Sequence, residues 1–111
     1  MGSGPSLDSK SAGGMTLRDA LLADNLLVVD VRGSEEAASG TRFPGSANIP
    51  VSDFQSRVDE LGEKVRPVVM HCRSGMRAGN CRDLAKQAGY VNVFSVASAE
   101  ELLSLMGQVK P

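Results

Sequence analysis

The chain has 111 residues, of which 41% are hydrophobic and 23% are charged, and its formal net charge is −1. These values are typical of one globular domain that is long enough to bury a hydrophobic core. The near-neutral charge argues against a nucleic-acid partner, and the longest apolar runs fall far short of the roughly 20 residues of a transmembrane helix.

The first residues differ in composition from the rest of the chain. Residues 1–14 (MGSGPSLDSKSAGG) are mostly glycine, serine, proline and alanine, a composition typical of disordered segments. We therefore predict a disordered tail or an expression scar over residues 1–14 and one domain over residues 15–111. Gly2 and Ser6 fit the loose N-myristoylation pattern, but a tag or a chance match is the favoured interpretation.

The sequence offers few metal-binding or disulfide-forming side chains. It contains two cysteines, Cys72 and Cys81, and one histidine, His71. These residues supply neither a disulfide framework nor the four ligands of a zinc site, so neither a metal nor an organic cofactor is expected. Free thiols fit a reducing compartment, which indicates the cytoplasm, with an organelle or a weak N-terminal lipid anchor as alternatives.

Predicted strands and helices alternate along the domain. The apolar runs at 26–31 and 68–72 are continuous, which is typical of strands buried on both faces of a parallel sheet. The alternation predicts an α/β fold with a small, mostly parallel central sheet flanked by helices on both faces. In chain order we predict a helix capped by Thr16 and ending near Ala23, a strand at Leu26–Val31, a helix capped by Ser34 and a strand at Ala47–Ile49. A helix from Ser52 to about Glu60 and a strand at Val68–Cys72 follow, and then a helix with Ala78, Cys81, Leu84, Ala85 and Ala88 on its apolar face. The last elements are a strand at Val91–Val96 and a helix opened by a capping box of Ser98 and Glu101.

The loop after the second long strand carries the candidate nucleophile. Cys72 ends the strand, and Arg73, Ser74, Gly75 and then a helix follow at once. The unpaired N–H groups of a helix N-terminus and nearby guanidinium groups lower a cysteine pKa from about 8.5 into the range of about 3.5–7.5. The same backbone N–H groups form a cradle for an anion.

The spacing of this loop resembles that of the rhodanese-type sulfurtransferases. Four residues separate Cys72 from Arg77, whereas protein tyrosine and dual-specificity phosphatases, which also begin their loop with His-Cys, place five residues there. Together with the loop, three further motifs carry the resemblance, in the order of the family, across about residues 26–96: Asp30-Val31-Arg32 with the acidic Ser34-Glu35-Glu36, then Pro44-Gly45-Ser46-Ala47-Asn48-Ile49-Pro50, and Gly89-Tyr90 to Val93-Phe94.

The chain departs from the family pattern at three places. Ala37 stands where the family usually has an aromatic residue, and the turn at Pro44 lacks the preceding Gly-His-Ile. The last strand of the family usually ends in Gly-Gly followed by a tryptophan, where this chain has Val96-Ala97-Ser98-Ala99. These positions bear on the pocket wall and the substrate more than on the fold.

The resemblance implies a sulfurtransferase that works through a persulfide on Cys72. The thiolate attacks the outer sulfur of thiosulfate or of a persulfide, and the sulfur then passes to cyanide or a thiol. The implied partners are a small anionic sulfur donor and a thiol or cyanide acceptor, with a protein as a further candidate acceptor. The alternatives are a sulfur-relay or binding module of the same fold and an arsenate reductase or phosphatase, against which the short loop argues.

The remaining loop residues are candidates for substrate binding. Arg73 and Arg77 would orient the anionic donor, and Arg77 has the stronger case because it lies at the junction of loop and helix. Gly75 suits a positive φ and offers its N–H group, and Ser74 either bonds the persulfide or merely suits the turn. Met76 is predicted to line the mouth of the pocket.

The other polar residues near the predicted sheet edge have supporting roles in this interpretation. Asp30 and Arg32 follow a strand at the edge where such folds bind ligands, and a structural ion pair or bonds to the backbone are favoured over catalysis. His71 precedes Cys72 and should therefore point to the opposite face of the sheet. Cys81 lies on the apolar helical face, which favours core packing over the alternative role of a resolving cysteine.

Overall fold

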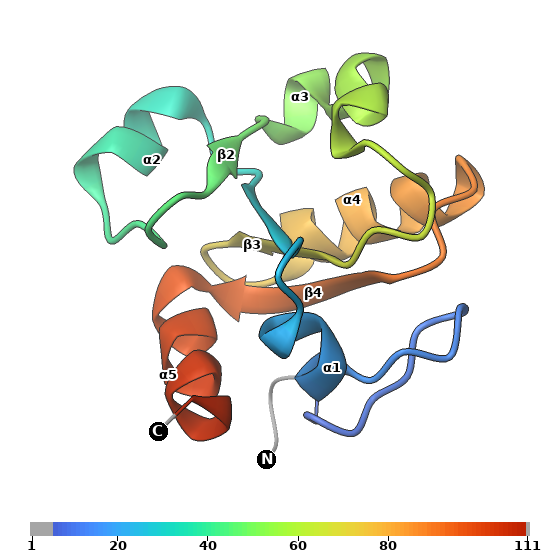
Figure 1. Ribbon diagram of the computed structural model, residues 1–111. Coiled ribbons are helices and arrows are strands. Elements are labelled where there is room, and N and C mark those ends of the chain that lie inside the picture. Colours follow the sequence, from blue (N-terminus) through green and yellow to red (C-terminus); the bar gives the residue numbers. More distant parts are fainter. Residues whose placement is uncertain (1–5, 111) are drawn as a thin grey trace.

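In the computed structural model, which describes residues 6–110, four parallel strands form one sheet in the order β2-β1-β3-β4, with helices on both of its faces (Figure 1). The predicted α/β class with a mostly parallel sheet is confirmed. In chain order the elements are α1 (Leu17–Leu22), β1 (Leu27–Asp30), α2 (Ser34–Ser39), β2 (Ala47–Asn48), α3 (Val51–Phe54), the 3-10 helix η1 (Gln55–Leu61), β3 (Val68–Cys72), α4 (Met76–Gln87), β4 (Val93–Ser98) and α5 (Ala99–Val109).

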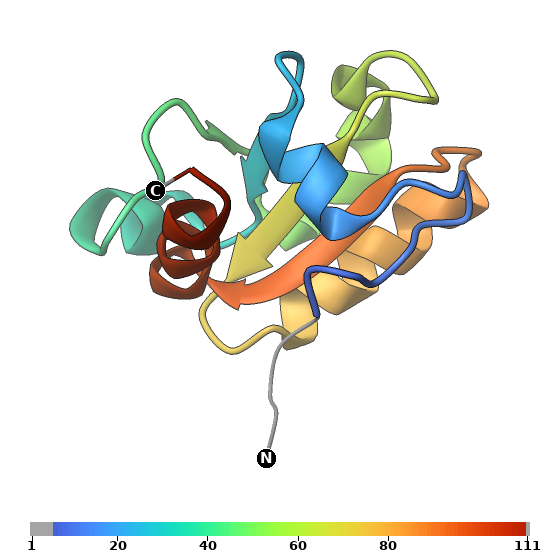
Figure 2. The ribbon, with the colours of Figure 1, turned by 60° about the horizontal axis from the view of Figure 1, so that its bottom comes forward.

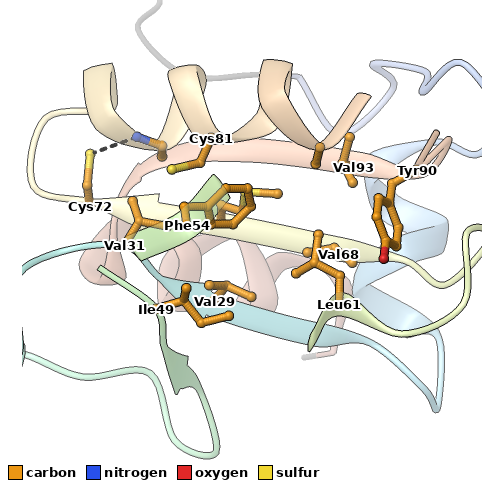
Figure 3. Packing of buried hydrophobic residues seen from close by; sticks show 13 residues of the cluster. Val29, Val31, Ile49, Phe54, Leu61, Val68, Cys72, Cys81, Tyr90 and Val93 are labelled. Atoms are coloured by element: carbon orange, nitrogen blue, oxygen red, sulfur yellow. Dashed lines mark hydrogen bonds between the residues drawn. The ribbon is translucent and has the colours of Figure 1, made fainter. Parts of the chain in front are cut away.

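The sheet separates two hydrophobic cores, and β3 contributes to both because all five of its residues are buried. Successive side chains of a strand point to opposite faces. Val68, Met70 and Cys72 therefore belong to the core beneath α3, η1 and α4, while Val69 belongs to the core beneath α1 and α5. Figure 3 shows the first of these cores, with the α4 side chains packed against the sheet.

Several predicted elements have different boundaries in the structure. β1, predicted at Leu26–Val31, is one residue shorter at each end, and β2, predicted at Ala47–Ile49, ends at Asn48. The helix predicted from Ser52 begins one residue earlier, at Val51, and continues after four residues as a 3-10 helix. The last strand begins at Val93, two residues later than predicted, and runs to Ser98. Val91 lies outside the sheet because its N–H donates to the carbonyl of Lys64 and its own carbonyl accepts from Gly13.

The predicted helix caps are confirmed in part. Thr16 forms the expected capping box with Asp19, but Gly33 is the N-cap of α2 and Ser34 is its first helical residue. The Ser98 hydroxyl accepts from the Glu101 N–H, as a cap should, whereas the Glu101 carboxylate accepts from the N–H of Ala97 and so does not complete the predicted box. Within the described chain, every helix falls short of what a bilayer crossing requires.

The described part of the predicted tail, residues 6–14, lies against the domain. Leu7 packs against the core of α1 and α5, and Lys10 forms an isolated antiparallel bridge with Thr16. The Ser11 hydroxyl donates to Oδ1 of Asn92 at 2.6 Å. The amino-acid composition of a segment does not reveal such specific contacts. The predicted myristoylation site at Gly2 lies outside the described residues.

Candidate active site

The ends of three parallel strands meet at one edge of the sheet, and the candidate nucleophile lies there. β1 ends at Asp30, β3 at Cys72 and β4 at Ser98. In parallel α/β sheets ligands bind outside this carboxyl edge. Helix α4 begins at Met76, so its N-terminus lies only a short loop away from the Cys72 thiol.

The sulfur of Cys72 accepts hydrogen bonds from the backbone at the start of α4. The N–H of Gly75 lies 3.0 Å from Sγ and the N–H of Ala78 lies 3.4 Å from it; Figure 3 draws the second bond as a dashed line. Cys72 is 1% exposed, and burial alone would raise its pKa. The N–H groups of Ala78, Gly75, Ser74 and Arg73 outweigh burial, so the pKa of the thiol is lowered.

Gly75 gives the loop the backbone conformation that aims these N–H groups. It is the N-cap of α4 and has a φ of 98°, a value that residues with a side chain rarely adopt. A Cβ atom at this position would also lie 3.4 Å from Cα of Ala97 in β4. The expected positive φ is therefore present, and the same residue lets the loop pass close to the neighbouring strand.

A cavity of about 250 Å³ opens beside Cys72. Its lining is mainly polar and includes side chains of both charges, which suits a charged ligand better than an apolar one. It is lined by Arg32, Glu36, Ser39, Gly40, Thr41, Cys72, Arg73, Ser98 and Glu100.

Arg77 is engaged by a carboxylate of α2. Its Nη1 and Nη2 donate to the two carboxylate oxygens of Glu36 at 2.9 and 2.8 Å, in the parallel geometry that such pairs favour. These bonds lower the pKa of Glu36 to about 2 and raise the pKa of Arg77. The pair fastens the first turn of α4, and with it the Cys72 loop, to α2.

Arg32 is held by a second, buried ion pair. Its Nε and Nη2 donate to the Asp30 carboxylate at 2.9 and 2.7 Å, and Nη2 also donates to the carbonyl of Thr41 at 2.9 Å. Asp30 is fully buried and Arg32 is 6% exposed. Burial alone would raise the pKa of Asp30, but the bonds from Arg32 outweigh it and lower that pKa. The expected structural ion pair is confirmed, and it ties β1 to the cavity wall.

Arg73 differs from the other two arginines. It is exposed, it lines the cavity, and its side chain has no hydrogen bond or ion pair with any other residue of the described chain. Residues 74–77 do not line the cavity, and Met76, predicted at its mouth, is 75% exposed at the start of α4. Of the predicted loop residues, the structure brings Cys72 and Arg73 together at the cavity.

His71 and Cys81 are buried, as their predicted structural roles require. His71 pairs in register with Asp30, and neither of its ring nitrogens has a hydrogen-bond partner within residues 6–110. Burial lowers the pKa of this imidazole, against the opposing charge of Asp30. Burial, and to a smaller extent the negative charge of Cys72, raise the pKa of Cys81 to about 11. Cys81 therefore stays a neutral thiol of the core (Figure 3).

Several cavity residues were missed in the sequence. Ser98 ends β4 at the same sheet edge as Cys72, and this position in the strand order is the signal that could have revealed it. Glu100 follows in α5, where its own N–H and then the Thr41 hydroxyl lower its pKa. The sequence shows Glu36 only as part of the acidic Ser34-Glu35-Glu36 motif, because its pairing with Arg77 spans 41 positions and leaves no local pattern.

Comparison with known proteins identifies relatives with this fold. A sequence profile for the rhodanese-like domain matches residues 16–99. Thiosulfate:glutathione sulfurtransferase of Homo sapiens is 33% identical over 96 residues, covering 75% of this chain and 83% of that protein. The structure of human single-domain sulfurtransferase TSTD1 aligns with a TM-score of 0.64 and 31% identity over 79% of this chain and 89% of that one. An Escherichia coli rhodanese with bound anions shares the fold, with a TM-score of 0.60 at 23% identity over 65% of this chain and 86% of that one.

The backbone bonds to Sγ predict that Cys72 ionises below the ordinary thiol pKa of about 8.5. Thiolate absorbance at 240 nm, measured as wild type minus Cys72→Ser over a pH series, should therefore rise with a midpoint below that value. The subtraction cancels the contributions of Cys81 and of Tyr90, the single tyrosine. A midpoint at or above 8.5 would show that burial outweighs the backbone bonds.

The buried pair predicts a large loss of stability in Asp30→Asn. This variant leaves the Arg32 guanidinium buried without its carboxylate, a defect that costs roughly 3–5 kcal/mol in the free energy of unfolding. Urea unfolding measures it, with Glu60→Gln as a control that breaks the exposed pair with Arg57 and should change stability little. The double variant Asp30→Asn/Arg32→Met should recover part of the loss. If Asp30→Asn unfolds like the wild type, the pair does not stabilise the fold.

Proposed function

The chain belongs to the rhodanese-like domain family of sulfurtransferases, and on this premise we propose that it transfers sulfane sulfur through a persulfide on Cys72. The observation that carries this proposal is the pair of backbone N–H groups, from Gly75 and Ala78, that bond Sγ at 3.0 and 3.4 Å at the edge of a polar cavity. Thiolates are the reactive form of cysteine, and these bonds favour the thiolate.

In the first half of the proposed reaction, the Cys72 thiolate attacks the outer sulfur of thiosulfate. A new S–S bond forms to Sγ, the S–S bond of thiosulfate breaks, and sulfite leaves with the bonding electron pair. A low-molecular-weight persulfide donor would react in the same way and leave as a thiolate. The negative charge then lies on the terminal sulfur of the persulfide, beside backbone N–H groups that act as oxyanion-hole donors do.

In the second half, an acceptor takes the terminal sulfur and regenerates the Cys72 thiolate. A thiolate acceptor becomes a persulfide, and cyanide becomes thiocyanate, each by forming a bond to the sulfur as the Cys72 S–S bond breaks. Neither step requires a general base if the acceptor reacts as an anion. The buried, neutral His71 is consistent with such a mechanism. A free reactive thiol also fits a reducing compartment, with the cytoplasm as the first candidate.

We assign attraction of the anionic donor to Arg73. The guanidinium of Arg77 is hydrogen-bonded to Glu36, and that of Arg32 is hydrogen-bonded to Asp30 and to the Thr41 carbonyl. Arg73 retains all its donors and faces the cavity that Cys72 borders. Arg77, which the sequence favoured as the anion ligand, instead serves to position the loop through α2 in this proposal.

Intact-protein mass spectrometry after incubation with thiosulfate tests the persulfide directly. The wild type should gain about 32 Da, the mass of one sulfur, and lose it on addition of cyanide with release of thiocyanate. Cys72→Ser should gain nothing, while Cys81→Ser should still gain the sulfur because Cys81 lies in the core. The absence of an adduct with thiosulfate and with a low-molecular-weight persulfide would remove this proposal and favour tests with arsenate and aryl phosphates.

Steady-state kinetics tests the assignment of Arg73. Arg73→Gln should raise the KM for thiosulfate about tenfold or more, since a hydrogen bond to a charged group contributes roughly 1.5–3 kcal/mol and 1.4 kcal/mol is a factor of ten. The matched control is Arg57→Gln, because Arg57 lies on η1 and does not line the cavity. An unchanged KM in Arg73→Gln would show that the donor is held by other groups.

A further inference from the structure

We propose that a second cavity, on the outer side of β4, binds a small phosphorylated molecule. The cavity has a volume of about 230 Å³ and lies between the segment 9–12, the second half of α4 and the beginning of β4. Three basic side chains line it, Lys10, Arg82 and Lys86, and no acidic residue does. The cavity beside Cys72, by contrast, contains carboxylates as well as guanidinium groups.

The floor of this cavity is the open edge of the sheet. β4 is the outermost strand, and Val68 of β3 pairs with Val93 while its N–H donates to the carbonyl of Asn92. In a parallel ladder this alternation turns the backbone groups of Val93 and Ser95 away from β3. Neither the N–H nor the carbonyl groups of these two residues form a hydrogen bond with another described segment. Their N–H groups therefore face the cavity edge as free donors for an anion.

The segment 9–12 forms one wall of this cavity, and hydrogen bonds hold it in place. The N–H of Gly13 donates to the carbonyl of Val91 at 2.9 Å, and the Ser11 hydroxyl donates to Oδ1 of Asn92 at 2.6 Å. Asn92 is 7% exposed, and its Nδ2 donates to the carbonyl of Val65. A Cβ atom on Gly13 would lie 2.4 Å from Oδ1 of Asn92, so any other residue would have to displace either this hydrogen-bonded side chain or the segment itself. Figure 2 shows the segment passing along β4.

The basic side chains are arranged to receive a ligand of more than one negative charge. Nη1 of Arg82 donates to the Ser95 hydroxyl at 2.9 Å, which holds the guanidinium against β4. Its Nε donates to Oδ1 of Asp83 at 3.2 Å in an exposed ion pair. Within residues 6–110, Nη2 of Arg82 has no partner, and neither Lys10 nor Lys86 makes an ion pair. A phosphate ester carries a charge of about −1.5 to −2 at pH 7 and accepts bonds from guanidinium, ammonium and backbone N–H groups together.

The shape of the cavity favours a small ligand over an acidic peptide. A peptide that added to β4 as a further strand would have to run along the whole edge of the sheet. Gly13 already bonds to Val91 immediately before β4, and the segment 9–12 covers the adjoining part of the edge. The remaining space is the size of a small organic phosphate.

Amide chemical shifts of the full chain, labelled with ¹⁵N and titrated with inorganic phosphate at constant ionic strength, test this proposal. The amide signals of Ser11, Val93 and Ser95 should shift and saturate. Any binding of phosphate at the Cys72 loop is distinguished by its own signals, those of residues 73–78. Shifts at the β4 cavity that grow linearly without saturating would overturn the proposal, as would saturation by a glutamate-rich peptide but not by phosphate.

Two variants test the charges and the wall separately. Arg82→Gln/Lys86→Gln should weaken phosphate binding at the β4 cavity at least tenfold and leave the loop signals unchanged, whereas Arg57→Gln/Lys110→Gln removes the same charge elsewhere and should have no effect there. Gly13→Ala keeps all three basic residues but must displace the wall, and should weaken binding at least threefold. Equal affinity in the wild type and the first double variant would exclude this site.

Discussion

The chemistry proposed for this protein depends on one arrangement, the convergence of helix N–H groups on a buried sulfur. Cys72 is almost without solvent contact, so its thiolate has to be stabilised by the protein. The N–H groups of Gly75 and Ala78 do this because the loop is short and Gly75 adopts a positive φ. They are the free donors that every helix N-terminus has, placed where a charge must form. β3 carries Cys72 and α4 packs against it in one hydrophobic core, so the distance between the sulfur and the N–H donors is fixed.

Ion pairs then decide which charges remain available to a ligand. Three arginines lie around Cys72, but two of them, Arg77 and Arg32, are paired with Glu36 and Asp30. The pair of Arg77 with Glu36 joins residues 41 positions apart, and Arg32, paired with its near neighbour Asp30, also bonds the carbonyl of Thr41, so both arginines help to shape the cavity. Arg73 is exposed, and its guanidinium makes no ion pair within the described chain, so it is the arginine left available to a ligand.

Local sequence patterns predicted the elements well where a single cause determines them. The strand Val68–Cys72 is predicted at both ends, because a continuous apolar run stops at a loop of polar residues. The position of Cys72 at the end of this strand and the positive φ of Gly75 follow from the same strand-loop-helix pattern. The pairing of Glu36 with Arg77 and the docking of Ser11 on Asn92 could not be predicted, since each depends on the tertiary placement of two distant side chains. Boundaries failed for the same reason at Val91, whose backbone is bound by segments outside the sheet.

Helix α4 connects the two cavities, and its packing sets the geometry of both. Its first turn supplies the N–H groups at Cys72, and its second half carries Arg82 and Lys86 on the side that faces the edge of β4. Between them, Ala78, Cys81 and Ala85 are fully buried against the sheet. Small side chains allow the helix to lie close to β3 and β4, and close packing leaves it little freedom to shift. The helix therefore holds the N–H donors at Cys72 and the basic side chains at the β4 cavity at a fixed separation.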